Sequence, residues 1–178
     1  KFLFKEGKNN INIRLFSGNI KIVSIKIFSP QNIDNYEQYI KNHEYKNNKP
    51  YIKIIEAEKP DYKNDTSVNP VSSRDLEVYP YSTDNLLLNT LGKDSWEKAG
   101  QKVIYTFSVP ETGYYKIAYY YLQNSKSNSL VYRSIDLDGK TLFDEMKKVT
   151  FEYTNNWKMY EPDYMFYLEK GEHYLSLE

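Results

Sequence analysis

Hydrophobic and polar residues alternate through residues 103–122, and this alternation predicts two β-strands. Every second residue of the first stretch is apolar or aromatic, which is the period of a half-buried strand. Its apolar row is Val103, Tyr105, Phe107 and Val109. Pro110 and Gly113 then mark a turn, because proline donates no ladder hydrogen bond and glycine tolerates positive φ. Alternation resumes with Tyr115, Ile117, Tyr119 and Tyr121. We predict a central antiparallel hairpin in an all-β domain.

An internal repeat links the two ends of the chain. Residues 2–13 repeat the pattern of residues 166–177 without a gap, and each copy has a strand, a charged glycine turn and an alternating strand. We therefore predict that residues 1–28 are an N-terminal hairpin plus one more strand, Ile20–Phe28, which closes an upstream module. The same segment could instead supply a strand to the main sandwich, in the same chain or a neighbour, and we predict that it packs there as an ordered sheet.

A short amphipathic helix is predicted next. Ser29 suits the N-cap and Pro30 the first helical position. Apolar residues follow at helical spacing as far as about Asn42, and residues 43–50 are polar. Residues 29–50 are therefore interpreted as a helical linker.

Residues 51–178 carry the pattern of a complete β-domain. Residues 59–95 are rich in Asp, Asn, Ser and Pro, and long loops of this kind tend to be functional. Asp138-Gly139 predicts a type I′ turn. The expected strands are 51–56, 86–89, 103–109, 115–122, 129–137, 141–143, 149–153, 164–168 and 173–177, with one helical turn at 144–148.

Composition narrows the function classes. Lys and Arg number 24 and Asp and Glu number 24, a balance that argues against nucleic acid or an anionic membrane surface as main partner. Cysteine is absent, which excludes disulfides and thiolate metal sites. No apolar run reaches the length of a membrane span. The 19 tyrosines suit exposed strands and ligand platforms alike.

Four motifs, in order, resemble the galactose-binding-like β-sandwich of carbohydrate-binding modules that contain calcium. They are Ile55-Glu56-Ala57-Glu58, the strand pair around Val109-Pro110-Glu111-Thr112-Gly113, Leu137-Asp138-Gly139-Lys140, and Tyr167-Leu168-Glu169-Lys170-Gly171-Glu172-His173. More narrowly, Arg74-Asp75, Pro80-Tyr81-Ser82, Leu88-Asn89-Thr90 and Ser95-Trp96 are similar to tandem modules of large Firmicute extracellular proteins, often fused to an ABC-transporter solute-binding domain. The resemblance implies a jelly-roll sandwich, an extracellular or cell-surface location, a carbohydrate partner and contact with neighbouring modules.

Glu56 and Glu58 are the candidate metal ligands. They lie two residues apart on a predicted strand and would face the same side, where two carboxylates suit calcium if backbone carbonyls complete the shell. The resemblance also implies a structural calcium ion. The alternative is a solvated strand end.

The candidate sugar ligands combine flat rings with polar groups. Aromatic faces match the apolar face of a sugar, and Asn, Asp and Arg match its hydroxyl rim. The candidates are Arg74, Asp75, Tyr79, Tyr81, Asn89, Trp96, Arg133 and Trp157. The alternative for Trp96 is that it plugs the end of the sandwich, and the alternative for Trp157 is packing at the rim. Arg133 lies on the core-facing side of a predicted strand, so the alternative for it is a structural ion pair.

The sequence favours a binding module over an enzyme. The only histidines, His43 and His173, have no nucleophile motif around them, and there is no Gly-rich phosphate loop. We expect a non-catalytic extracellular module that binds or presents a glycan. The alternative is a structural module that packs against its tandem partner and positions another domain. Lys102 favours this alternative, because the carbohydrate-binding modules that the chain resembles usually carry an aromatic residue at this position.

Overall fold

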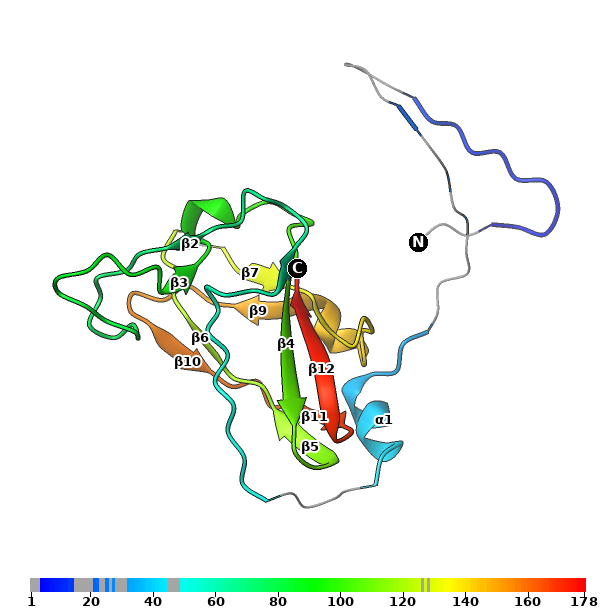
Figure 1. Cartoon of the computed structure of the whole chain (residues 1–178). Helices are drawn as coiled ribbons and strands as arrows, with labels where there is room; N and C mark the ends of the chain where they lie inside the picture. Colours follow the sequence, from blue (N-terminus) through cyan, green and yellow to red (C-terminus); the bar gives the residue numbers. More distant parts are fainter. Residues whose placement is uncertain are drawn as a thin grey trace. The chain divides into compact units, whose positions relative to one another are not determined.

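The computed structural model describes residues 4–14, 21, 22, 25, 27, 32–44, 49–125, 127 and 129–178. The chain divides into two compact units, residues 1–32 and residues 33–178, and each is described by itself. Antiparallel strands dominate the larger unit (Figure 1). Its strands are β1 (Tyr62–Lys63), β2 (Pro70–Val71), β3 (Thr90–Leu91), β4 (Val103–Val109), β5 (Gly113–Lys116), β6 (Tyr119–Tyr121), β7 (Val131–Arg133), β8 (Ile135–Leu137), β9 (Val149–Phe151), β10 (Lys158–Tyr160), β11 (Met165–Leu168) and β12 (Gly171–Leu177). Its helices are α1 (Tyr36–Lys41) and the 3-10 helices η1 (Lys93–Ser95) and η2 (Asp144–Lys148).

One layer is a four-stranded antiparallel sheet in the order β1-β4-β12-β8. Strands β4 and β12 run side by side in Figure 1 and pair along their whole length, from Val109 opposite Gly171 to Val103 opposite Leu177. Val103, Tyr105 and Val109 are buried, so the predicted apolar row of this strand is confirmed.

The remaining strands form two-stranded ribbons, and those that pair β5 with β11, β6 with β10 and β7 with β9 pack against the four-stranded sheet. One hydrophobic cluster joins both layers, because it contains side chains from β4, β8 and β12 together with side chains from β5, β6, β7, β9, β10 and β11. Phe143 and Phe166 lie in this cluster, fully buried and stacked with ring centroids 5.7 Å apart. The chain is therefore all-β, as predicted.

The prediction of a central hairpin formed by residues 103–122 is wrong. Strands β4 and β5 do not pair with each other, because β4 pairs with β1 and β12 while β5 pairs with β11. Residues 110–112 therefore carry the chain from one layer to the other. The physical reason is that β12 offers β4 a partner of seven residues, whereas β5 has four.

The predicted strand at residues 129–137 is split at Ser134. Arg133 at the end of β7 pairs with Val149 of β9, whereas Ile135 at the start of β8 pairs with Leu177 of β12. The chain therefore changes sheets at this residue. The turn after β8 is as predicted, since Asp138 (φ 52°) and Gly139 (φ 71°) both adopt the positive φ of a type I′ turn.

The predicted strand at residues 51–56 is also wrong, because no strand is assigned to these residues. The Tyr51 hydroxyl donates to the Ser108 carbonyl oxygen at 3.1 Å. Ile52 and Ile54 are 88% and 81% exposed. Apolar alternation forms a strand only where a hydrogen-bonding partner runs alongside, and none of the described residues pairs with this segment.

Helix α1 begins later than predicted. Residues 32–35 are not helical, and the N-cap is Asn35, whose side chain accepts from the Gln38 N–H while the Gln38 side chain accepts from the Asn35 N–H. This capping box is a stronger start signal than a serine and proline upstream. The helix ends at the C-cap Asn42, close to the predicted end.

Helix α1 packs on the sandwich although it was predicted within a linker. Tyr39 is 6% exposed, and its ring lies 5.1 Å from that of Phe143. The Tyr39 hydroxyl accepts a hydrogen bond from the backbone N–H of Tyr167 at 2.8 Å. The Tyr36 hydroxyl accepts one from the backbone N–H of Met165 at 2.9 Å. These two hydroxyls cap the N–H groups of β11 that face away from β5.

The smaller unit is described mainly at residues 4–14, where no strand is assigned. The Asn9 side chain donates to the carbonyl oxygens of Lys5 and Gly7 at 2.8 and 3.1 Å and thereby closes a turn at the predicted place. Most of Ile20–Phe28 lies outside the described residues. The assignment of residues 1–28 to an upstream module, and their packing on the sandwich, stay predictions.

Candidate functional site

The outward face of the β6–β10 ribbon carries two exposed side chains, Tyr120 and Met159, beside the half-buried Trp157. Tyr119 and Tyr121 point into the core, so Tyr120 between them points outward and is 46% exposed. It pairs across the ribbon with Met159, which is 61% exposed. Trp157, two residues before Met159, stacks on Tyr120 with ring centroids 5.5 Å apart and an interplanar angle of 28°. We call Tyr120, Trp157 and Met159 the platform.

A loop of residues 72–81 carries four of the predicted ligand residues. Arg74, Asp75, Tyr79 and Tyr81 are exposed, and Tyr79 is 86% exposed. The Asp75 carboxylate accepts from the Glu77 N–H at 3.0 Å and shapes a local turn. The loop therefore presents a free phenol ring and both charge signs to solvent.

Asn89 holds this loop in place. It is 5% exposed, and its amide group makes every bond within the protein. Its carbonyl oxygen accepts from Ser73 N–H at 2.7 Å, and its NH₂ group donates to the oxygens of Ser73 and Pro80 at 3.0 and 2.9 Å. With both donors and the acceptor used, Asn89 acts as a loop anchor in this structure, and no amide donor is left for a sugar.

Two acidic side chains of the loop influence the pKa of Tyr120. Burial raises the pKa of Tyr120, and the negative charges of Glu77 and Asp75 raise it further. The loop carboxylates are thus close enough to Tyr120 for electrostatic interaction.

Trp96 and Arg133 come together away from the platform. The Arg133 guanidinium carbon lies 3.9 Å from the centroid of the Trp96 ring, and its Nη2 donates to the Trp96 carbonyl oxygen at 2.7 Å. Burial lowers the pKa of Arg133. No carboxylate among the described residues forms an ion pair with this side chain, so the cation–π contact and the carbonyl replace the predicted ion pair.

Trp96 is also anchored from its other groups. Its indole N–H donates to the Gln101 carbonyl oxygen at 3.0 Å, and the ring packs against the cluster of Val68, Val103 and Tyr105. Gln101, 3% exposed, donates to Asp65, Ser67 and Ser95. This end of the sandwich is a packed network, which favours the interpretation of Trp96 as a core plug.

The predicted metal ligands lie on a turn rather than on a strand, where the Lys59 N–H donates to the Glu56 carbonyl oxygen at 3.0 Å. Their side chains consequently differ in exposure, 40% for Glu56 and 6% for Glu58. The Lys59 ammonium pairs with Glu56 and lies 4.0 Å from Glu58 Oε1. Across the described residues, no three Asp, Glu, His or Cys side chains gather in a possible metal site.

Glu58 Oε1 is buried and has no hydrogen-bond partner among the described residues. A buried carboxylate oxygen of this kind suits a cation, and Lys59 is the cation nearest to it. The donor set is therefore short of the six to eight oxygens that calcium takes, unless backbone carbonyls and water supply the rest. The calcium ion stays a prediction.

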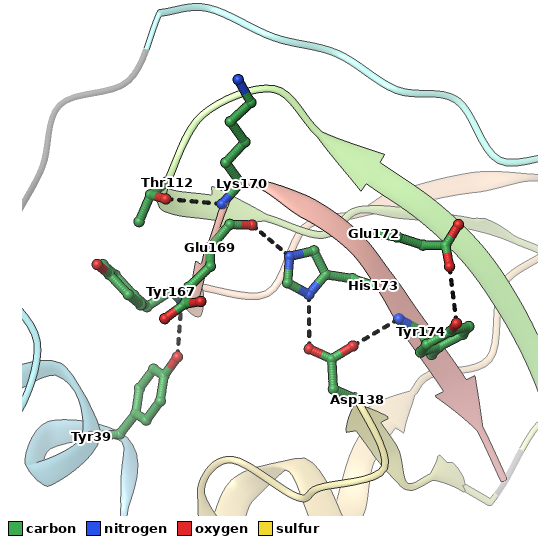
Figure 2. A network of polar contacts seen from close by, with 9 residues as sticks. All are labelled: Tyr39, Thr112, Asp138, Tyr167, Glu169, Lys170, Glu172, His173 and Tyr174. Carbon is green, nitrogen blue, oxygen red and sulfur yellow. Dashed lines mark hydrogen bonds and ion pairs between the residues drawn. The ribbon is translucent and has the colours of Figure 1, made fainter.

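A network of polar contacts lies at the start of β12 (Figure 2). His173 contacts the Asp138 carboxylate through Nδ1 and the Glu169 carbonyl oxygen through Nε2. Asp138 also accepts from the Tyr174 N–H at 2.9 Å, and the Thr112 hydroxyl accepts from the Lys170 N–H at 2.9 Å. The motifs Leu137-Asp138-Gly139 and Gly171-Glu172-His173 are therefore joined in space.

The structure gathers the predicted ligand residues into two places. Trp157 belongs to the platform, and charges in the loop of residues 72–81 raise the pKa of its neighbour Tyr120. Trp96 and Arg133 form a packed pair elsewhere. Tyr120 was not among the predicted ligand residues. The sequence signal for Tyr120 was its position in the predicted strand 115–122, where it falls on the same side as Lys116 and Ala118, both of which are exposed.

In the described part of the chain, no helix combines the length and apolarity needed to cross a membrane. No family model and no curated protein matches the sequence. The solved structures that resemble part of this chain include two enzymes.

One is a cycloisomaltooligosaccharide glucanotransferase of Paenibacillus sp., with a TM-score of 0.48 and 20% identity over 69% of this chain. The other is a ruminal GH26 endo-β-1,4-mannanase, with a TM-score of 0.42 and 20% identity over 73% of this chain. This chain spans 15% and 24% of the length of those two proteins. Both of these proteins are carbohydrate-active enzymes.

Proposed function

We propose that the chain is a non-catalytic, extracellular carbohydrate-binding module of the galactose-binding-like jelly-roll type, and that its ligand stacks on the platform. The observation that carries this proposal is the stacked pair of Tyr120 and Trp157 on the outward face of the β6–β10 ribbon. Flat, rigid aromatic rings give a large contact area at a low cost in conformational entropy, and a sugar ring offers them an apolar face. The extracellular location rests on the resemblance in sequence.

The surroundings of the platform support a neutral ligand. Asp75 and Glu77 bring negative charge to Tyr120, as its raised pKa reflects after the larger effect of burial. Carboxylates accept hydrogen bonds from sugar hydroxyls but repel uronate and sulfate groups. We therefore expect neutral oligosaccharides to bind and polyanionic ones to be rejected.

The contacts of His173 support a non-catalytic role. His173 uses both ring nitrogens in contacts within the protein. A general base needs a ring nitrogen that is free to reach substrate, so the contacts of His173 argue against such a role for this residue.

The test is a glycan array with the full chain, followed by calorimetric titration of the best neutral oligosaccharide. Tyr120→Ala should weaken binding by about tenfold, which corresponds to about 1.4 kcal/mol. Tyr132→Ala is the matched control, because Tyr132 is 41% exposed on β7, in a different ribbon. Unchanged binding by Tyr120→Ala, or equal binding of a polyuronate, would contradict the proposal.

A structural role is the second candidate, and helix α1 favours it. This helix follows the smaller unit in the chain and is anchored on β11 by Tyr36 and Tyr39. A helix fixed on the sandwich in this way suits a structural module. A negative glycan array together with unchanged stability of the platform variants would favour this role.

A further inference from the structure

His173 is a buried histidine that joins two turns. It is 7% exposed and lies near the start of β12. Its Nδ1 is 2.8 Å from the Asp138 carboxylate in the turn after β8, and its Nε2 is 2.7 Å from the Glu169 carbonyl oxygen in the turn between β11 and β12 (Figure 2). The ring therefore bridges a turn of the four-stranded sheet and the turn that leads into it from the other layer.

Both partners of the ring are hydrogen-bond acceptors. A neutral imidazole has one N–H donor, whereas an imidazolium has two. Both contacts can be hydrogen bonds only when the ring is protonated. After deprotonation, one ring nitrogen would turn its lone pair toward an oxygen lone pair, and a contact that held two turns together would become repulsive.

The acceptors cannot easily turn away. Asp138 is held at φ 52° in its turn, and its other carboxylate oxygen accepts from the Tyr174 N–H at 2.9 Å. Glu169 directly follows β11, and the next residue, Lys170, donates its N–H to the Thr112 hydroxyl at 2.9 Å. A change in the ring must therefore be absorbed by the turns themselves.

The charges around the ring agree with a proton bound there. Burial is the largest single effect and lowers the pKa of His173, whereas the hydrogen bonds to the Glu169 carbonyl and to Asp138, and the negative charges of Asp138 and Glu169, all raise it. The net effect is a raised pKa. On β4, the uncharged ring of Phe107 lies 5.8 Å from the imidazole ring.

We propose that His173, Asp138 and the Glu169 carbonyl form a pH-sensitive clamp, which holds the two turns together while the imidazole is protonated and releases them when its proton passes to solvent. The direction follows from linkage. Because the folded protein binds this proton more tightly than the unfolded chain, the clamp contributes fully below about pH 6.5, the unfolded value. Its contribution is lost as the pH rises through the pKa of the folded state.

The experiment is thermal unfolding of the full chain across a pH series, with wild type and His173→Gln compared at each pH. Between about pH 6 and about pH 9 we expect the wild-type Tm to fall by about 3–6 °C more than that of His173→Gln. His43→Gln is the matched control, and it should keep the wild-type pH dependence. Equal slopes for wild type and His173→Gln would overturn the proposal.

A second measurement does not depend on the stability of the variant. In the NMR spectrum of the His43→Gln protein, the one remaining histidine signal belongs to His173 and reports its titration directly. We expect a midpoint above about 6.5, and a lower midpoint in the Asp138→Asn variant, which keeps an acceptor but loses the charge. A midpoint at or below the unfolded value would show that the ring is neutral in the fold and would overturn the clamp.

Discussion

Removal of the Asn89 side chain is expected to destabilise the loop of residues 72–81. Asn89→Ala deletes three hydrogen bonds of 2.7–3.0 Å between a buried amide group and the loop backbone at Ser73 and Pro80. At about 1 kcal/mol for each bond, the loss is roughly 3 kcal/mol of unfolding free energy. For a domain of this size that corresponds to a fall in Tm of about 6–12 °C.

The chemistry of the amide allows a sharper variant. Asn89→Asp keeps an oxygen for the Ser73 N–H but replaces the two N–H donors with an oxygen that faces the carbonyls of Ser73 and Pro80. We therefore expect it to be at least as destabilising as Asn89→Ala. Asn85→Ala, at an exposed asparagine of the same loop region, should change stability by no more than about 0.5 kcal/mol.

Urea unfolding followed by circular dichroism measures these differences, with the Tm as a second readout. The reasoning is refuted if Asn89→Ala melts together with Asn85→Ala, or if Asn89→Asp is as stable as wild type. Either result would mean that water replaces the amide of Asn89 without cost, and that the loop is held by other contacts.

Two further outcomes follow from the structure. Tyr39→Phe removes the hydroxyl that accepts the N–H of β11 at 2.8 Å, so urea unfolding should show a loss of about 1–2 kcal/mol, whereas Tyr62→Phe, at a tyrosine 56% exposed, should leave stability unchanged. Similar losses for the two variants would contradict the capping role of α1. If calcium binds at Glu56 and Glu58, added calcium should raise the Tm of wild type but not of Glu58→Gln, and a chelator should reverse the gain. If neither calcium nor chelator changes the wild-type Tm, calcium does not bind here, and Lys59 is the cation that accompanies these carboxylates.

The candidate site was predicted only in part. Trp157 and the exposed residues of the loop could be found, because aromatic and polar residues gather in loop-rich sequence. Tyr120 could have been found by parity alone, since its strand alternates between the core and solvent. The pairing of Trp96 with Arg133 could not, because 37 residues separate them in the chain and only the packed fold brings them together.

The role of Asn89 could not be predicted from the sequence either. Its residue type suits a sugar ligand and a loop anchor equally well, and only the positions of Ser73 and Pro80 decide between them. The metal candidates were likewise judged on the assumption of a strand. Once residues 56–59 form a turn, the two carboxylates no longer share one face.

Local patterns were sufficient for the all-β class, the buried row of β4, the half-buried row of β5 and β6, the Asp138-Gly139 turn and the end of α1. Each of these depends on a period or on the φ preference of one or two residues, and such preferences act within a few residues of chain. The partners of the strands depended on tertiary structure. Strand β4 pairs with β12 rather than β5, and residues 51–56 form no strand, because a ladder needs a second chain segment at hydrogen-bonding distance along its whole length, and sequence alternation does not say which segment that will be.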